Sequence, residues 1–182
     1  MKIHETELTI LRGSVLDQPV DAIVNAANTA MRGGGVLDGA IHRAAGREML
    51  LELERVAPQG SETSEVVVTG GYNLPQKFVF HVAGPIWNAA RGQQCDELLA
   101  HSYRNCLHEA QNRGLQSLAF PSLSTGVYSF PIDRAAPIAV GVAVDFLKEN
   151  PQTSLQRVIF AMFGGTEYHF FDKALKKHVS HS

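Results

Sequence analysis

The sequence predicts an α/β domain in which helices cover both faces of a central β-sheet, and three observations predict it. Short runs rich in β-branched and aromatic residues alternate along the chain with longer segments of helical periodicity. Several short runs are apolar throughout, which is typical of strands buried on both faces. Polar or glycine-rich segments follow three of the runs, after Val24, Phe120 and Phe163. Because open α/β sheets bind ligands at the carboxyl ends of their strands, these segments are candidates for one shared site.

The strands are predicted from short β-branched or aromatic runs that are bounded by turn residues. Glycine, proline and asparagine separate these runs from the segments that follow them. The expected strands cover residues 8–11, 22–24, 65–69, 77–83, 117–120 and 157–163.

The helices are predicted from apolar residues at helical spacing. In the second helix we expect Leu50, Leu51 and Leu53 to pack against the core. Pro137 predicts either a kink or a later start for the fourth helix, and Thr166 is the expected cap of the last one. The expected helices run from Asp38 to near Gly46 and over residues 48–56, 95–112, 131–148 and 166–177.

Charge and hydropathy exclude several classes of partner. Basic and acidic residues are spread along the chain and sum to a formal net charge of -2. This argues against a basic nucleic-acid surface or a polybasic membrane patch, so we expect neither nucleic acid nor membrane as a partner. The N-terminus lacks the apolar core of a signal peptide, and no apolar run is long enough to span a bilayer. We expect residues 1–182 to form one cytoplasmic domain with a loose tail over residues 178–182.

Neither the cysteines nor the histidines have the spacing of a metal site. Cys95 and Cys106 lie in one expected helix, and we expect reduced thiols there. The eight histidines are scattered and form no HxxxH pair with a nearby carboxylate pattern. We therefore expect no metal and no cofactor.

A glycine loop between a strand and a helix is the strongest candidate binding element. Residues 20–46 place a short apolar strand, two asparagines (Asn25 and Asn28), the glycines 33–35 and a helix start at Asp38 in that order. Consecutive backbone N–H groups beside a helix N-terminus form an anion site without any Lys or Arg. The asparagines add neutral donors and acceptors that suit hydroxyl groups.

Three polar side chains, two after this loop and one in the expected strand 77–83, each have a structural and a functional interpretation. Asp38 is either a helix-start residue that the helix dipole favours or a group that orients or deprotonates water. His42 lies one turn later on the same face and is either a local hydrogen-bonding residue or part of the site. His81 is flanked by apolar strand residues, which favours a hydrogen-bonded core histidine.

A second polar segment, residues 124–128, follows the strand that ends at Phe120. Ser124, Thr125 and Gly126 lack the G-x-S-x-G frame of a nucleophilic serine, so a donor-rich anion loop is the better interpretation. Tyr128 either shapes the pocket wall or packs. Phe163, at a strand end, is either a core residue or a ring that stacks on a base.

Motifs of other nucleotide-binding classes are missing. The chain has no GxxxxGK[ST] sequence, which argues against a P-loop kinase or ATPase. The glycines that follow Arg32 do not form GxGxxG with a later acidic ribose ligand, so a dinucleotide redox enzyme is a weak alternative.

Four motifs, in this order, resemble the macrodomain family and specifically its MacroD-type branch of bacterial O-acetyl-ADP-ribose deacetylases. The resemblance covers nearly the whole chain and implies a three-layer α/β/α domain with a mixed, mostly parallel sheet. It also implies an ADP-ribose cleft at the strand ends and metal-independent hydrolysis at C1″ of the distal ribose, or of an ester on that ribose. The motifs are VDAIVNAAN (20–28), GGG with DGAIHRAAG (33–35, 38–46), HVAGPIW (81–87) and FPSLSTGVYSFP (120–131).

The resemblance also implies a role for individual residues. Asn28 matches the asparagine that orients the distal ribose, Asp38 the catalytic aspartate, and His42 a histidine near the same site. Phe163 falls where an aromatic ring stacks on adenine, and Ser14 and Val15 fall at the adenine end. The segments expected to clasp the diphosphate and distal ribose are Gly33, Gly34, Gly35, Val36 and Leu37 on one side, and Ser124, Thr125, Gly126, Val127 and Tyr128 on the other.

Three positions depart from the family pattern. Ser14 stands where an aspartate usually binds the adenine amino group, and losing the charge-assisted bond is expected to weaken adenine recognition by roughly 1–2 kcal/mol. Val36 replaces a fourth glycine, and Gly164 replaces an acidic or amide residue.

The sequence therefore leaves three hypotheses. The first is a hydrolase that removes mono-ADP-ribose from acidic side chains of proteins and deacetylates O-acetyl-ADP-ribose. The second is a non-catalytic reader of ADP-ribose or a related nucleotide, which Ser14 and Val36 favour mildly. The third is a binder of another nucleotide or of an RNA end.

Overall fold

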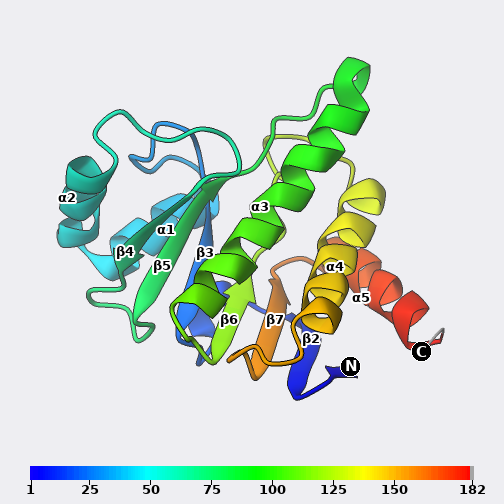
Figure 1. Cartoon of the computed structure of the whole chain (residues 1–182). Helices are drawn as coiled ribbons and strands as arrows, with labels where there is room; N and C mark the ends of the chain where they lie inside the picture. Colours follow the sequence, from blue (N-terminus) through cyan, green and yellow to red (C-terminus); the bar gives the residue numbers. More distant parts are fainter. Residues whose placement is uncertain (181–182) are drawn as a thin grey trace.

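A seven-stranded mixed sheet forms the middle layer of the protein (Figure 1). The computed structural model describes residues 1–180. The strand order is β1-β2-β7-β6-β3-β5-β4, in which β2, β7, β6, β3 and β5 run parallel and the two edge strands pair antiparallel with their neighbours. This confirms the mixed, mostly parallel sheet. The strands are β1 (Lys2–Ile3), β2 (Thr6–Arg12), β3 (Ala22–Ala27), β4 (Val66–Gly70), β5 (Phe78–Ala83), β6 (Ser117–Phe120) and β7 (Arg157–Met162).

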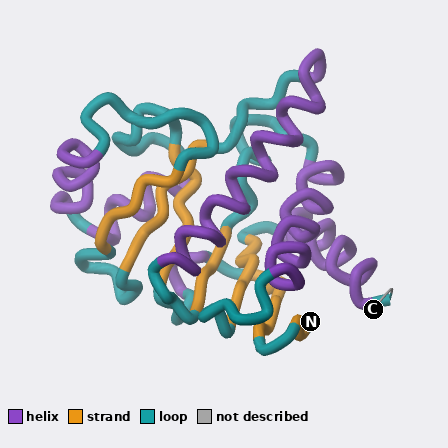
Figure 2. The backbone as a smooth tube through the Cα atoms, in the orientation of Figure 1, coloured by secondary structure: helices purple, strands orange, loops and turns teal. Residues whose placement is uncertain are grey.

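Helices cover both faces of the sheet, which confirms the three-layer α/β/α architecture (Figures 1 and 2). Helices α3 (Gly92–Asn112), α4 (Ile132–Glu149) and α5 (Gly165–Val179) pack on one face. Helices α1 (Val36–Ala45) and α2 (Arg47–Val56) pack on the other. Two short 3-10 turns, η1 (Val15–Asp17) and η2 (Ala89–Arg91), complete the structure. No helix within residues 1–180 combines the length and apolarity needed to cross a membrane.

Alternate residues of each central strand supply the two halves of the core. On β6, Leu118 and Phe120 face the layer of α3, α4 and α5, whereas Ala119 between them faces the α1 layer. The same alternation places Val24 on the first face and Ile23 on the second. Because both faces are covered, both sets must be apolar, which explains the continuous apolar runs in the sequence.

The second helix shows a packing error in the sequence prediction. Met49 and Leu53, four residues apart, are the buried residues of α2. Leu50 is half-buried, and Leu51 is 46 % exposed, so the expectation that Leu51 packs is wrong. A stripe at i and i+4 can face the core, whereas Leu51 lies between its two residues and faces away.

The expected cap of α5 is wrong, and one of the two alternatives for α4 is excluded. Helix α4 begins at Ile132 directly after Pro131, so Pro137 lies inside the helix and does not mark a later start. Pro137 cannot donate to the carbonyl four residues earlier, a loss that the packing of this largely buried helix tolerates. Helix α5 is capped at Gly164 with no side-chain cap, and Thr166 lies within its first turn.

Part of the segment expected to be a loose tail is helical. Helix α5 includes His178 and Val179, so these two residues of the expected loose segment are helical. Residues 181 and 182 lie outside the described part of the chain.

Candidate active site

A cleft of about 590 Å³ lies at the carboxyl ends of the five parallel strands. Its size is that of a small-molecule site, and its position is the one where α/β sheets bind ligands. The wall comes from the segments that follow β2, β3, β5, β6 and β7, together with the start of α1 and one residue of α5. Segments far apart in the sequence therefore meet here, as the sequence predicted.

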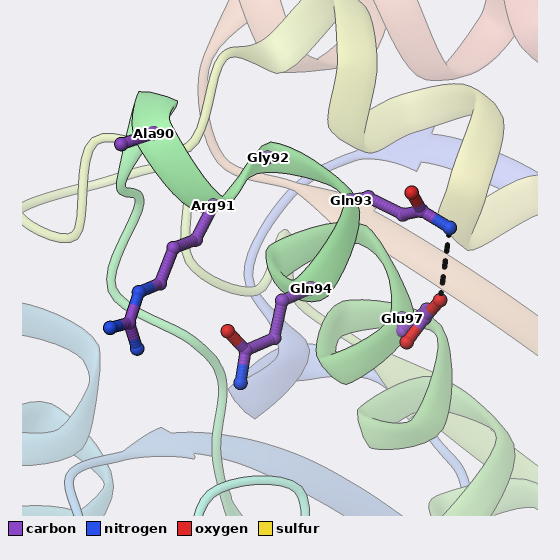
Figure 3. A pocket seen from close by; sticks show the side chains of 6 residues that line it. All are labelled: Ala90, Arg91, Gly92, Gln93, Gln94 and Glu97. Carbon is purple, nitrogen blue, oxygen red and sulfur yellow. Dashed lines mark hydrogen bonds between the residues drawn. The ribbon is translucent and has the colours of Figure 1, made fainter.

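A second, shallower hollow of about 380 Å³ lies at the start of α3 (Figure 3). It is formed by one stretch of chain, residues 90–97, whose side chains are mostly exposed. The bond between Gln93 Nε2 and Glu97 Oε1 is 3.5 Å long and joins two exposed side chains of the same helix. With no buried polar group facing it, this hollow is a poorer candidate than the cleft.

The glycine loop reaches the cleft through its last residues and the first turn of α1. Gly35 is the N-cap of α1 and makes no side-chain cap, so the first N–H groups of the helix have no side-chain partner there. Asn28 makes two hydrogen bonds that stabilise the glycine loop. Its Nδ2 donates to the carbonyl of Gly33 at 3.2 Å, and its Oδ1 accepts from the amide of Met31 at 3.2 Å. Gly33 and Gly34 have φ values of +91° and +154°, and residues with a side chain rarely adopt such values. This geometry suits an anion held by backbone donors.

Asp38 is the carboxylate at the floor of the cleft. It lies in the first turn of α1 and is 2 % exposed. Its Oδ1 accepts a hydrogen bond from Asn25 Nδ2 at 2.7 Å. His42 Nε2 lies 3.3 Å from the same oxygen, within ion-pair distance but without hydrogen-bond geometry. Asp38 therefore has one oxygen held from behind while the residue itself lines the cleft.

The second loop, residues 124–128, forms the opposite wall. Ser124 has a φ of +67° although it is not a glycine, and its buried Oγ has no partner among the described residues. Gly84 lies directly beneath, and a Cβ there would collide with that hydroxyl. The Trp87 amide donates to the carbonyl of Tyr128 at 2.9 Å and anchors the end of the loop. A strained residue in the wall of a cleft whose buried hydroxyl lacks a partner is the arrangement expected of a binding loop.

An exposed ring marks the other end of the cleft. Phe163 follows β7 and is 87 % exposed, which excludes the interpretation as a core residue. Ser14 Oγ accepts from the amide of Leu16 at 3.2 Å and caps η1. Glu167, in the first turn of α5, also lines this end, and its Oε2 is buried without a partner in the described structure.

The structure brings most of the predicted site residues together. Those that line the cleft are Ser14, Val15, Asn28, Gly35, Val36, Leu37, Asp38, Ser124, Thr125, Gly126, Val127, Tyr128 and Phe163. Four others are not among the residues that line it, namely Asn25, Gly33, Gly34 and His42.

Sequence reasoning missed part of the wall. Glu167 is one of the missed residues, and one oxygen of its carboxylate has no partner within the described structure. The sequence offered a single indication of it, an acidic residue in the first turn of a helix. Gly84, Pro121 and Ser122 lie within the motifs 81–87 and 120–131 but were not singled out as site residues. The remaining missed residues are Gly13, Leu16, Ala26, Ala27, Ala40 and Ala161.

The buried histidine next to this site predicts a pH dependence of stability. Burial first, and the nearby His42 second, lower the pKa of His81 from its ordinary 6.5 to about 3, against an opposing effect of Asp38. The unfolded chain takes up a proton near pH 6.5, while the folded protein takes it up only near pH 3, so stability is full above pH 6.5 and falls as the pH drops toward 3. We expect the free energy of unfolding to be lower at pH 5 than at pH 7 by about 2 kcal/mol from this residue alone.

Urea unfolding of the wild type and of His81→Gln at pH 7, 6 and 5 measures this contribution. The variant lacks the titrating ring, so its stability should fall less between pH 7 and pH 5. Equal slopes for the two proteins would show that His81 is not the group responsible.

Comparisons with known proteins agree with this geometry. Residues 24–139 match the model of the Macro domain family. A macro domain-containing protein of Caldanaerobacter subterraneus is 40 % identical over 173 residues, which cover 94 % of this chain and 97 % of that protein. The ADP-ribose glycohydrolase MACROD2 of Mus musculus is 39 % identical over 171 residues, which cover 94 % of this chain and 35 % of that protein.

Similarity extends to solved structures. A macrodomain of Oceanobacillus iheyensis, solved with ADP, superposes with a TM-score of 0.91 at 38 % identity and covers all of this chain and 96 % of that one. The matched family model, the sequence relatives and this superposition agree with the α/β/α layers and with the motifs that surround the cleft. The chain therefore belongs to the Macro domain family.

Proposed function

We propose that the protein is an ADP-ribose-binding hydrolase that removes mono-ADP-ribose from acidic side chains of proteins and deacetylates O-acetyl-ADP-ribose. The observation that carries the proposal is the Asp38 carboxylate, which lines the cleft and is held from behind by Asn25. The glycoside-hydrolysing activity in the name of the relative MACROD2 supports the same reaction class. Mono-ADP-ribosylated proteins would be the macromolecular partners.

An extended ligand with a base, a diphosphate and a distal ribose matches the order of groups along the cleft. The exposed ring of Phe163 offers a stacking surface for the base at one end. Gly35 and the first turn of α1 offer backbone N–H groups for the diphosphate, and the facing loop adds the hydroxyls of Ser124 and Thr125. The distal ribose would then lie against Asn28 and Asp38.

Hydrolysis needs an activated water at the distal ribose. Asp38 would orient this water and accept its proton, while the water oxygen forms the new bond at C1″ or at the ester carbon. Attack at C1″ expels the carboxylate of the modified side chain or acetate, whereas attack at the ester carbon expels the ribose oxygen, which takes up the proton while acetate forms. A phosphate oxygen of the ligand, held near the N-terminus of α1, would share the task of holding the water.

A reader without catalysis is the second candidate, and Val36 favours it. This residue begins α1 at the rim of the cleft, and its branched side chain is 91 % exposed. A side chain at this position restricts the loop and reduces the space beside the distal ribose. The cleft would then bind ADP-ribose while hindering the approach of water or of a modified protein.

Two measurements on one preparation separate these functions. Titration calorimetry with ADP-ribose tests binding, and a time course of O-acetyl-ADP-ribose with catalytic amounts of protein tests turnover. We expect one ADP-ribose per chain and repeated deacetylation. Binding without turnover would support the reader, and a competition panel in which ADP-ribose displaces no other nucleotide would support a different ligand.

A further inference from the structure

Three polar side chains form a buried row behind the cleft. Thr69, His81 and Asn25 lie on the neighbouring strands β4, β5 and β3, and each is at most 1 % exposed. Asn25 and His81 are direct partners in the parallel register of β3 and β5. None of the three lines the cleft, so none can touch a ligand there. The row nevertheless ends on Asp38, which does line it.

Hydrogen bonds connect the row from end to end. Thr69 Oγ1 donates to the carbonyl of Gly70 at 3.0 Å and lies 2.9 Å from His81 Nε2. His81 Nδ1 lies 3.0 Å from Asn25 Nδ2, which also donates to Asp38 Oδ1 at 2.7 Å. These contacts restrict where the protons can lie. The hydroxyl of Thr69 has a single hydrogen, and once Gly70 accepts it, the hydroxyl can only accept from His81 Nε2–H.

The state of His81 then determines how the amide of Asn25 is turned. With its proton on Nε2, the ring presents Nδ1 as an acceptor, so Asn25 must point its amide nitrogen toward the ring. Burial lowers the pKa of His81 to about 3, so the ring is neutral and can present this acceptor. The same amide nitrogen reaches Asp38 with its second hydrogen. Both hydrogens of the amide are thereby used.

The alternative, in which His81 carries its proton on Nδ1 and not on Nε2, conflicts with a carboxylate at Asp38. A proton on His81 Nδ1 would require the oxygen of Asn25 to face the ring. That oxygen would also face Asp38 Oδ1, and two acceptors would meet unless Asp38 carried a proton. A proton on Nε2 is therefore the order that fits a carboxylate at Asp38, and Thr69 with the carbonyl of Gly70 favours that order from the far end.

An unpaired oxygen of Asn25 indicates that the row of polar side chains serves the cleft and not only the stability of the fold. The Oδ1 atom of Asn25 is buried and has no partner within the described structure. A buried polar atom without a partner destabilises the fold, and such atoms in native proteins cluster where function requires them. The Asn25 side chain makes no hydrogen bond at its oxygen within the described structure, whereas its amide nitrogen lies within hydrogen-bond distance of both Asp38 and His81.

We infer that Thr69 and His81 are positioning residues that orient the Asp38 carboxylate through Asn25 by fixing the proton order along this row. The inference rests on the proposed function for its effect on catalysis, because it assigns Asp38 the role of holding water. The proton order itself does not depend on turnover. A purely structural role of the row would lower stability when broken without a selective effect on the chemical step.

The proton order can be measured directly in the wild type. Nitrogen NMR of the histidine rings, with His81 assigned by comparison with His81→Gln, distinguishes a protonated from an unprotonated nitrogen. We expect His81 to be neutral, with the proton on Nε2 and none on Nδ1. A proton on Nδ1, or on both nitrogens, near neutral pH would overturn the inference.

Two variants of Thr69 test the effect on catalysis with a matched control. Thr69→Val keeps the shape but removes the hydroxyl, whereas Thr69→Ser keeps the hydroxyl. For O-acetyl-ADP-ribose hydrolysis we expect kcat of the valine variant to fall about 10- to 100-fold, as it does when outer partners of a reactive group are removed. KM and the Kd for ADP-ribose should change by less than about twofold, and Thr69→Ser should restore kcat.

The outcomes separate this inference from the proposed function. An unchanged kcat in folded Thr69→Val, or an equal loss in the valine and serine variants, would overturn the positioning role. A wild type that binds ADP-ribose without hydrolysing it would contradict the proposed function, and the His81 resonances of the wild type and of Thr69→Val would still decide the proton order. If Thr69→Val does not fold, His81→Gln, which keeps a donor and an acceptor, takes its place and should retain more activity than His81→Leu.

Discussion

Replacing Asp38 by asparagine is expected to lower the rate of ADP-ribosyl ester hydrolysis by about 10²–10⁴-fold, the usual contribution of a general base. Asparagine has the same shape and can still accept the bond from Asn25 Nδ2, but it carries no charge and cannot take a proton from water. Binding of ADP-ribose should persist, because the groups proposed to hold the diphosphate and the base lie elsewhere in the cleft. Rapid-mixing turnover and titration calorimetry measure the two quantities separately.

Asp133 provides a matched control for Asp38→Asn. It is also an acidic residue in the first turn of a helix, α4, but it is exposed and does not line the cleft. Asp133→Asn should hydrolyse at the wild-type rate. Full activity of folded Asp38→Asn would show that the phosphate-held water needs no carboxylate and would remove Asp38 from the mechanism.

The second large effect is expected at Phe163, on binding. Phe163→Ala removes the ring proposed to stack on the base, and loss of one stacked base costs about 1–3 kcal/mol, or about 5- to 150-fold in Kd. The free energy of unfolding should hardly change, since the ring is 87 % exposed and contributes little to the core. Calorimetry with ADP-ribose and with ribose 5-phosphate compares a ligand that has the base with one that lacks it.

Ile86→Ala is the matched control, because Ile86 is 67 % exposed and apolar but does not line the cleft. It should bind ADP-ribose as the wild type does. The weakening in Phe163→Ala should disappear for the ligand without a base. An unchanged Kd for ADP-ribose in Phe163→Ala would place the base elsewhere in the cleft.

Much of the fold was predictable because its signals are local. A strand that is buried on both faces has to be an apolar run, so the end of the run marks the end of the strand. The polar segments after Val24, Phe120 and Phe163 could therefore be placed at strand ends. The error at Leu51 arose because this residue is as apolar as Leu50 and Leu53, and only the orientation of α2 against the sheet separates them. Pro137 left two alternatives open, because a proline disfavours a helix locally, whereas the packing of α4 allows it to lie inside one.

The row behind Asp38 could not be predicted from the sequence. His81 and Asn25 are 56 positions apart and meet because β5 lies beside β3, and the order of strands is a property of the whole sheet. Apolar neighbours favoured a core role for His81, and the structure agrees that it is buried and hydrogen-bonded. The residues that flank His81 in the sequence could not show that Asn25, which contacts its ring, also donates a hydrogen bond to Asp38. Glu167 was missed for a similar reason, since only the packing of α5 beside β2 brings it to the cleft.

Hydrolysis of ADP-ribosyl esters in this cleft can be tested in a single-turnover experiment. A substrate protein that is mono-ADP-ribosylated on glutamate is mixed with an excess of this protein, and the release of ADP-ribose is followed over time. We expect release in one exponential phase by the wild type and a collapse of that rate in Asp38→Asn. Folded wild type that binds ADP-ribose but releases none from the modified glutamate would contradict the proposed hydrolysis and leave the cleft as a reader of ADP-ribose.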